Sequence, residues 1–522
     1  MSGWTEDEFL EAGWPQDEEI LGRLADEVTA LEARGVTERK YQRKLLLRKF
    51  PQTPQRGLRA QPLSFAEAIQ AETPSDEDNL AGVRRSMSEV MSCPVIEAGA
   101  IMPDACPVGG AMSIPVGGAV VTEGAILPGA HGSDICCSLY ATFFQSDKEP
   151  SALMDELLGA TRFGPGMRPS EDRVHHPVVD EPVWENRFLS GLQDHARGHM
   201  ADQGDGNHFA FLGQVAWGEV EFQALEQAGH VELAESLRQG SQSGGDPLYA
   251  VVTHHGSRGL GAHVYKRGLQ AAVKQTAKDR SGIPDLASWL RVDTPEGESY
   301  WEALQYVKRW TWANHWSIHQ RFLKATGSKR LQEVGNEHNF VWKRGSRFFH
   351  GKGATPAWPD EEGRKRLGLI PLNMSAPILL VLGNDQEDYL SFAPHGAGRN
   401  VSRRALIRSY QTEDGRIDSQ AMEDLLSKAT DGLDVRWYLG RYDFSEGPLA
   451  YKPQEQVQRQ ISQFDLADVV GGIHPLGSIM AGRRVGDEED EWTPKKKRQI
   501  EHRNERRKER QKLRQTLHSD QD

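Results

Sequence analysis

The feature that most constrains the fold is a series of histidines held in loops of small residues beside short apolar runs. His254 closes the run Val251-Val252-Thr253, which predicts a strand that ends at the imidazole. His395 follows the apolar run 378–382, which predicts another strand, and it lies among small residues. Short strands that lead into glycine loops favour a fold that contains sheet over one built from helices alone.

The distribution of such runs predicts the fold class. Short apolar runs separated by glycine dominate residues 85–145 and 340–412, and they indicate strands joined by tight turns. Residues 183–240 and 262–328 instead look mainly helical. The strand and helix regions do not follow a regular βαβ order, and we find no internal repeat. We therefore expect an α+β fold with one large catalytic domain over residues 61–484.

Residues 1–60 differ from the rest of the chain in composition. From about residue 5 to 50, apolar residues recur at helical spacing among acids, and residues 40–49 are basic. The run Pro51-Gln52-Thr53-Pro54-Gln55 then interrupts the pattern. We predict an N-terminal helical extension over residues 1–60. An ordinary pair of surface helices is the simpler alternative.

The last segment, residues 485–522, is first acidic and then basic. Residues 487–491 are all acids, and eleven Lys/Arg against three Glu between Lys495 and Arg514 give a local charge near +8. This composition fits a solvated helical or disordered tail, a basic arm for RNA, or a segment that binds a partner.

Bulk composition narrows the class of protein. The chain has 522 residues, 38% of them hydrophobic, and no stretch approaches the ~20 apolar residues of a membrane span. The acidic start has no apolar leader pattern, so we expect a cytoplasmic protein with no membrane partner. Four cysteines, two of them adjacent, do not make a disulfide framework. The net charge of −13 argues against a general nucleic-acid coat but allows a local basic groove.

Side chains of metal-ligand type lie in similar loops. Asp134 and Cys137 are three residues apart, so a turn can direct both at one divalent ion such as Mn²⁺ or Zn²⁺. Cys136 is the competing thiol, which a strand would direct to the opposite face. The histidines of the set are His208, His254 and His338. One such histidine is more often structural. Three of them with a carboxylate and a thiolate could hold two ions that share a ligand, which suits phosphoryl displacement.

His395 has a different setting, in the loop Pro394-His395-Gly396-Ala397-Gly398-Arg399. Glycines beside the imidazole let a large anion approach the backbone, and Arg399 offers a planar set of donors for phosphate. This combination suggests phosphoryl or nucleotidyl transfer at an imidazole nitrogen. A buried histidine in a tight turn is the alternative that the loop alone leaves open.

The order of these motifs resembles that of the RtcB family of RNA-splicing and RNA-repair ligases. The resemblance covers about residues 90–405 and could extend to Ala450-Tyr451-Lys452. The matching segments, in chain order, are Met102-Pro103-Asp104, Gly132 to Cys137, Gly206-Asn207-His208-Phe209, His254 to Gly261, His338-Asn339, Lys352-Gly353-Ala354 and His395 to Arg399. Each segment is weak alone, and the ordered set carries the resemblance. It implies the αββα-type catalytic fold of that family.

The resemblance also implies roles for individual residues. Cys137 would bridge two Mn²⁺ ions, with His208 and His254 completing one site and Asp134 and His338 the other. His395 would take GMP from GTP as a phosphoramidate, and Asp104 would lie near the metals and the incoming 5′-hydroxyl. The expected nucleotide-binding residues are Asn207, Asn339, His395, Gly396, Ala397, Gly398, Arg399 and Tyr451.

The reaction implied by the resemblance is GTP- and Mn²⁺-dependent RNA ligation in RNA repair or tRNA splicing. An RNA end with a 3′-phosphate or 2′,3′-cyclic phosphate would be joined to a 5′-hydroxyl end through a guanylylated histidine. An activating protein partner could be needed. The chemistry is consistent, because a neutral imidazole is a good nucleophile and leaving group and divalent metals neutralise phosphate charge.

Three positions depart from the family pattern. Phe211 stands where an acid is usual, Asn373 replaces a serine, and Ala481 stands where a lysine that helps to hold guanine would fall. All three belong to the expected base-reading side, so we hypothesise retained phosphoryl chemistry with altered or weakened nucleotide selectivity. Two other functions stay open: a dinuclear-metal RNA phosphodiesterase or phosphatase, and a catalytically silent protein that binds RNA or a translation factor.

Overall fold

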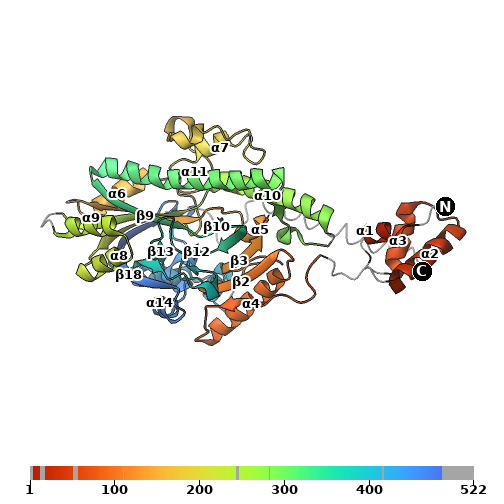
Figure 1. Ribbon diagram of the computed structural model, residues 1–522. Coiled ribbons are helices and arrows are strands. Elements are labelled where there is room, and N and C mark those ends of the chain that lie inside the picture. Colours follow the sequence, from red (N-terminus) through yellow and green to blue (C-terminus); the bar gives the residue numbers. More distant parts are fainter. Residues whose placement is uncertain are drawn as a thin grey trace.

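The computed structural model describes residues 4–11, 14, 18–50, 57–109, 111–242, 246–280, 282–413 and 417–484. Helices and strands are mixed along this part of the chain, and two large sheets form its centre, which confirms the predicted α+β class (Figure 1). Among the described residues, no helix has both the length and the apolar character needed to cross a bilayer. The predicted acidic-then-basic tail, 485–522, lies outside the described residues.

The larger sheet has eight strands and is antiparallel except at one edge pair. Its main path, in spatial order, is β13 (Leu367–Pro371), β14 (Ile378–Gly383), β18 (Ala467–Met480), β6 (Phe209–Val215), β7 (Leu248–His255), β5 (Ser138–Gln145) and β9 (Lys329–Glu337), with β16 (Asp434–Trp437) paired to β18. Neighbouring residues of a strand face opposite sides of the sheet, so Phe211 and Ala210 enter different apolar clusters.

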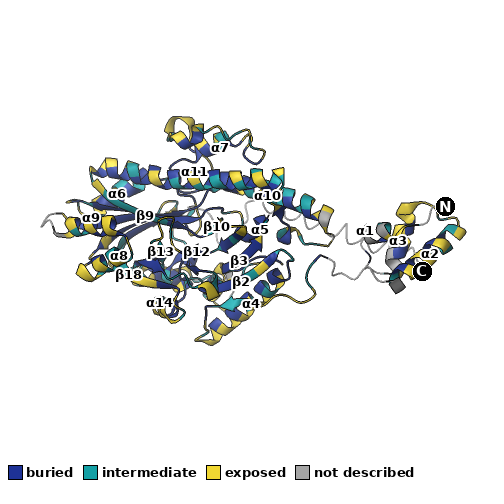
Figure 2. Ribbon diagram, viewed as in Figure 1, coloured by how far each residue is buried: buried dark blue, intermediate teal, exposed yellow. Residues whose placement is uncertain are grey.

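Helices cover both faces of this sheet. α8 (Glu219–Gln227) and α9 (Val231–Gln242) pack on the face that carries Phe211. α6 (Pro150–Ala160) and the long α11 (Pro295–Thr326) pack on the face that carries Ala210. Figure 1 shows α11 running along the body of the protein, and Figure 2 shows that the strands between the helix layers are buried.

The smaller sheet has five strands, in the order β1 (Ala66–Glu67), β2 (Ile96–Cys106), β3 (Val116–Glu123), β11 (Arg347–Lys352) and β10 (Asn339–Arg344). Ile101 of β2 packs against α4 (Pro74–Met91) on one face. On the other face, Met102 joins Val381 of β14 in a shared core. The two sheets therefore meet through apolar contacts, and loops from both can reach one site.

The remaining elements are short, apart from α10, α13 and α14. They are β4 (Ala125–Ile126), α5 (Pro128–His131), α7 (Gln193–Gly198), α10 (Arg258–Asp279), β8 (Leu290–Arg291), β12 (Ala354–Pro356), β15 (Phe392–Pro394), α12 (Arg403–Arg408), α13 (Ser419–Ala429), β17 (Gly440–Arg441), α14 (Gln454–Gln463) and β19 (Arg483–Arg484), with six short 3₁₀ turns.

The helical prediction for residues 183–240 was wrong at β6. This strand lies between β18 and β7 in the large sheet, and most of its residues are buried. A strand covered on both faces loses the alternation of apolar and polar residues that would reveal it in a sequence.

The first fifty residues contain α1 (Glu6–Glu11), α2 (Glu18–Ala33) and α3 (Arg39–Lys49). Their buried apolar side chains form one cluster, which consists of Phe9, Trp14, Leu21, Leu24, Val28, Leu31 and Leu46. The three helices pack against one another (Figure 1), and their outward faces are exposed (Figure 2).

Candidate metal and nucleotide site

The ligand-type side chains meet at the ends of adjacent strands of the large sheet. Cys137 directly precedes β5, whose first residue, Ser138, pairs with His255 of β7 and Glu337 of β9. This register places His254 on one side of Cys137 and His338 on the other. The backbone N–H of His338 donates to the Cys137 carbonyl at 2.9 Å, which fixes the two segments together.

A tight turn before β5 separates the two adjacent thiols. Cys136 has a φ of +59°, an uncommon value for a residue with a side chain, and the chain reverses there. Its side chain is fully buried in an apolar cluster with Ile135, whereas Cys137 faces the other ligands. Cys136 is therefore outside the ligand set.

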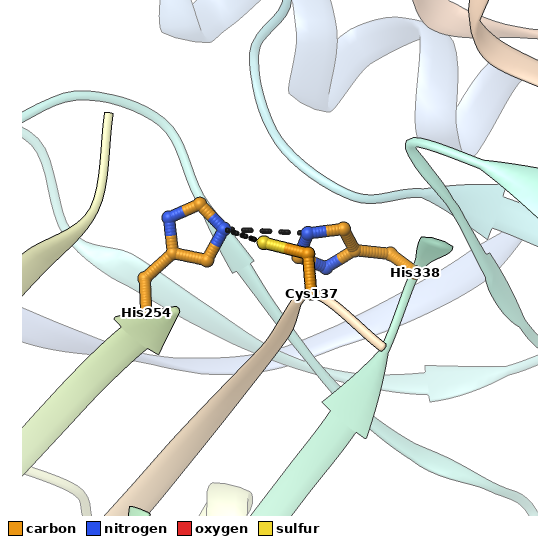
Figure 3. A group of neighbouring side chains, drawn as sticks. All are labelled: Cys137, His254 and His338. Carbon is orange, nitrogen blue, oxygen red and sulfur yellow. Dashed lines mark hydrogen bonds between the residues drawn. The ribbon is translucent and has the colours of Figure 1, made fainter. Parts of the chain in front are cut away.

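The ligand atoms form two groups that share Cys137. In the first, the Cys137 Sγ lies 3.2 Å from the His254 Nε2, which lies 3.3 Å from the His338 Nε2 (Figure 3). In the second, the Cys137 Sγ lies 3.6 Å from the His208 Nε2, which lies 3.2 Å from an Asp134 carboxylate oxygen. The grouping differs from the expected one, because β7 and β9 both flank β5 and thereby pair His254 with His338.

The donor chemistry of this cluster fits divalent metal ions. Burial lowers the pKa of His254 to about 3, so its imidazole is neutral at physiological pH. Its Nδ1 lies 3.2 Å from the Asn207 carbonyl and must donate there, which leaves the Nε2 lone pair directed at Cys137 and His338. Several lone-pair donors gathered in a buried space suit a divalent cation.

Charge at the cluster depends on the thiol and the carboxylate. Burial, together with the nearby Asp134, raises the pKa of the Cys137 thiol well above its usual value. Burial opposes ionisation of Asp134 too, but the charge of His208 and its hydrogen bond outweigh this and lower the pKa of Asp134. Without a metal the thiol therefore holds its proton while the carboxylate is ionised.

His395 lies beside this cluster. It follows β15, and the centre of its ring is 4.7 Å from that of His338. Its backbone N–H and its Nδ1 both bond to one carboxylate oxygen of Asp104, a fully buried residue of β2. Asp104 thus contacts His395 directly, a relationship beyond its expected place near the metals. Among the described residues, the other ring nitrogen, Nε2, has no hydrogen-bond partner.

Two glycines allow the His395 loop to pack this closely. Gly398 has a φ of +71°, and a Cβ there would lie 2.0 Å from the Asp104 carbonyl oxygen. Gly353 has a φ of +65°, and a Cβ there would lie 2.9 Å from the His395 ring. Both positions combine a left-handed backbone with a close contact, so only glycine fits.

A cavity of about 260 Å³ opens next to His395 and the metal-ligand cluster. The cavity wall includes Asp134, Cys137, His254, His338 and the predicted nucleotide-binding residues Asn207, Asn339, Gly396, Ala397, Gly398, Arg399 and Tyr451. His208 and Asp104 stand behind this wall, where they contact Cys137 and His395. The structure therefore brings together all of the predicted catalytic, metal-ligand and nucleotide-binding residues.

One end of the cavity is cationic. The Arg399 guanidinium stacks on the Tyr451 ring at 4.7 Å and donates to Glu446 at 2.8 Å. Arg403 also pairs with Glu446, which is buried. The Arg399 Nη1 is buried and has no partner among the described residues. Two guanidinium groups against one carboxylate, with a free donor, suit an anionic ligand.

Another part of the wall is mainly apolar, and the wall contains two of the three family departures. Phe211 lines it together with Phe209, Ile378, Met374 and Met480. Asn373 also lines the cavity, but its side-chain oxygen already accepts from the Ser375 N–H at 2.9 Å. Among the described residues, Ala481 is not part of the wall; it packs in an apolar cluster with Phe163, next to Met480.

Sequence reasoning missed Glu446 and Arg403. Glu446 lies in a short 3₁₀ turn, and Arg403 begins α12. Neither lies in one of the ordered motifs or beside a predicted strand, so no local pattern marked them. Their relation to Arg399 depends on chain segments that only the fold brings together.

A buried polar network lies behind the metal ligands. Two histidines of α11, His315 and His319, both contact the Thr253 hydroxyl of β7, at 2.7 and 2.9 Å. The other ring nitrogens contact β5, since His315 lies 3.0 Å from the Ser138 hydroxyl and His319 lies 2.7 Å from the Thr142 hydroxyl. The network ties α11 to the two strands that position Cys137 and His254.

Comparison with known proteins agrees with this architecture. A family model described as "tRNA-splicing ligase RtcB" matches residues 181–481, more than half of the chain. This range contains His208, His254, His338 and His395, and it starts after Asp104, Asp134 and Cys137. The chain belongs to the RtcB family.

Three of the curated relatives are similar to this chain over most of their length. A "tRNA-splicing ligase RtcB" of Archaeoglobus fulgidus is 26% identical over 459 residues, which covers 75% of this chain and 89% of the relative. The protein of the same description from Thermococcus kodakarensis is 26% identical over 435 residues, covering 70% and 84%. An "RNA-splicing ligase RtcB1" of Escherichia coli is 24% identical over 399 residues, covering 68% and 84%.

Proposed function

We propose that this protein is an RNA ligase that joins a 3′-phosphate or 2′,3′-cyclic phosphate end to a 5′-hydroxyl end, with GTP and two Mn²⁺ ions, in RNA repair or tRNA splicing. Membership of the RtcB family supports RNA ligation. The observation that carries the finer proposal is the setting of His395. One ring nitrogen is bound to Asp104, while the ring lies beside His338 and the cavity.

His395 is the proposed nucleophile. Its Nε2 attacks the α-phosphorus of GTP, an N–P bond forms, and the bond to the pyrophosphate leaving group breaks. Asp104 holds the ring through Nδ1 and stabilises the positive charge that develops on it. Arg399 donates from its free Nη1 to a phosphate oxygen. The product is a histidine that carries GMP as a phosphoramidate.

The two metal ions would be held by the groups described above. Cys137, His254 and His338 would hold one ion, and Asp134, Cys137 and His208 the other. When bound, the ions supply Lewis-acid neutralisation of phosphate charge. Asn207 supports this arrangement through its carbonyl, which orients the His254 ring.

The RNA steps follow from the chemistry of a phosphoramidate. Water first opens a 2′,3′-cyclic phosphate to a 3′-phosphate. The 3′-phosphate then takes GMP from His395, which regenerates the imidazole. The 5′-hydroxyl of the second RNA end attacks the activated phosphate, and GMP leaves as the new phosphodiester forms.

The test is covalent labelling followed by ligation. The protein is incubated with α-³²P-GTP and Mn²⁺, and acid-labile, alkali-stable label on the protein is counted. His395→Ala should abolish label and ligation, while His474→Ala, at an exposed histidine of β18, should keep both. Absence of label on the unaltered protein with every nucleotide would reject nucleotidyl transfer. Cyclic-phosphate hydrolysis alone would instead identify a metal-dependent phosphodiesterase.

Altered nucleotide selectivity is a second candidate, supported by the apolar wall. Phe211 offers no hydrogen bond to a base, and the Asn373 oxygen is already used by Ser375. A wall of this kind stacks or packs against any purine but discriminates weakly between them. Labelling with each of the four α-³²P-NTPs at equal concentration tests this. Label from GTP alone would contradict it, and comparable label from ATP and GTP is expected.

A further inference from the structure

The N-terminal helices have the form of a helix–turn–helix unit. α2 and α3 are joined by residues 34–38, in which Gly35 has a φ of +82°. The N–H groups of Gly35 and Val36 donate back to the last turn of α2, at 2.9 and 3.0 Å, and close the turn. With its own apolar core, the unit presents α3 as a well-defined outer helix.

Four of the basic residues of α3 fall into two kinds. Arg39 pairs with Glu8 at 2.7 Å and stacks over Trp4 at 5.1 Å, and Lys49 pairs with Glu27. These two cations hold the three helices together. Lys40 and Lys44 are exposed, and neither forms an ion pair in the part of the chain that the structure describes. Within that part of the chain, no carboxylate neutralises their charges, which suits them to a partner.

The unpaired lysines share one face with an exposed aromatic ring. Lys40 and Lys44 are one helical turn apart, about 6 Å along the axis. Tyr41 and Leu45 form the neighbouring column, and their exposed fractions are 56% and 36%. Buried Gln42 and Leu46 lie on the opposite side of α3. The face formed by Lys40, Tyr41, Lys44 and Leu45 thus combines point charges with an open aromatic surface.

We propose that this face of α3 binds a single-stranded segment of RNA. The ammonium groups of Lys40 and Lys44 would contact successive phosphates, and a base would stack on Tyr41. Cations and an aromatic ring alternate on this face, although the chain as a whole has a net charge of −13. The local positive charge is complementary to the phosphates of RNA, and the ring can stack on a base. This contact is separate from the cavity at His395. This proposal rests on the proposed function in one respect only, namely that the bound RNA is a substrate of the enzyme.

The test is equilibrium binding of a fluorescent, unstructured RNA of about 20 nucleotides to the full-length chain between 50 and 300 mM KCl. Lys40→Gln with Lys44→Gln should lower the slope of log K against log salt by about 1.4, for two lost phosphate contacts. Affinity at 0.1 M salt should fall on the order of tenfold. Tyr41→Ala should weaken binding roughly tenfold without changing the slope, and Tyr41→Phe should restore it.

The matched control is Lys274→Gln with Lys278→Gln, two exposed lysines at the same spacing on α10. It removes equal charge from the body of the protein and should leave affinity and slope unchanged. An unaltered slope in the Lys40 and Lys44 variant would overturn the proposal, and so would an equal loss in the control. Because the readout is binding without catalysis, failure of ligation would bear on the proposed function alone.

Discussion

The Nδ1 atom of His395 lies 2.5 Å from a carboxylate oxygen of Asp104, although 291 positions separate the two residues in the chain. The carboxylate is fully buried, and the same oxygen also accepts the His395 backbone N–H at 3.1 Å. The pair fixes the orientation of the imidazole ring and leaves Nε2 as the ring nitrogen that is not bonded to Asp104.

Replacing Asp104 by asparagine tests this relationship. Asp104→Asn keeps the shape of the side chain but removes the charge that stabilises a positively charged ring during attack. We expect the rate of nucleotide transfer to His395 to fall by roughly 10²–10⁴-fold, with little change in KM for the nucleotide. Single-turnover labelling measures both. Asp418→Asn, at the N-terminus of α13 where either residue caps well, serves as control. An unchanged rate would show that the carboxylate has no part in the step.

Metal binding should depend on pH through Cys137. Burial raises the pKa of this thiol well above its usual value, whereas that of His254 is lowered to about 3. Between pH 7.5 and 8.5 the free thiol is therefore protonated and His254 is neutral, so binding a metal as thiolate must release one proton. Mn²⁺ affinity should rise about tenfold per pH unit in this window.

Calorimetry in two buffers of different ionisation enthalpy measures the released proton directly. Cys137→Ser should abolish the release and weaken binding, while Cys136→Ala should retain the release, since Cys136 is outside the ligand set. Proton release that persists in Cys137→Ser would assign it to another group.

Gly398 offers a test of the close packing between the His395 loop and β2. Gly398→Ala combines a positive φ with a Cβ 2.0 Å from the Asp104 carbonyl oxygen. Gly363→Ala has an equally positive φ of +77° but open space around its Cβ. We expect the Gly363 variant to lose about 1 kcal/mol of unfolding free energy, and the Gly398 variant to lose several times more along with nucleotide transfer. Urea unfolding separates them, and equal losses would mean that the loop can move away.

His350 provides a test of acid stability away from the site. It is fully buried on β11, its Nε2 accepts from the Leu127 N–H at 3.0 Å, and burial lowers its pKa to about 3. The unfolded chain, with an ordinary histidine pKa near 6.5, binds a proton that the folded chain does not. Stability contributed by the neutral ring is therefore complete above pH 6.5 and is lost as pH falls toward 3.

His350→Gln keeps an acceptor for Leu127 but cannot titrate. The slope of unfolding free energy against pH between 4.5 and 6 should decrease by about 1.4 kcal/mol per pH unit. His474→Gln, at an exposed position, should leave the slope unchanged. A slope in His350→Gln identical to that of the unaltered protein would contradict the assignment.

The elements that could be predicted from sequence are those with a local cause. The runs 340–342 and 378–382 are uniformly apolar, and both lie in strands, β10 and β14. The strand expected to end at His254 also exists, as β7. β6 escaped prediction because its character depends on burial between two other strands.

The candidate site also combines residues that could be predicted from the sequence with contacts that could not. The residues in glycine loops were recognised by their spacing and by the family order of motifs. The pairing of His254 with His338 was not recognised from the sequence, because it depends on which strands flank β5. Glu446 and its ion pairs with Arg399 and Arg403 arise from segments about 45 residues apart, which leave no mark in the sequence.

The network of hydroxyl and imidazole groups behind the metal ligands determines which of its atoms carry hydrogens. The Ser138 hydroxyl lies 3.0 Å from the Cys136 carbonyl and donates to it, so it must accept from the His315 Nε2. Thr253 then donates to the His315 Nδ1 and accepts from the His319 Nε2, which leaves the His319 Nδ1 to accept from Thr142. Every member is satisfied with both rings in one tautomer. The hydrogen bonds that link α11, β5 and β7 therefore all donate in the same direction along this network. The network holds together the strands that position Cys137 and His254, and it does so without a metal ion.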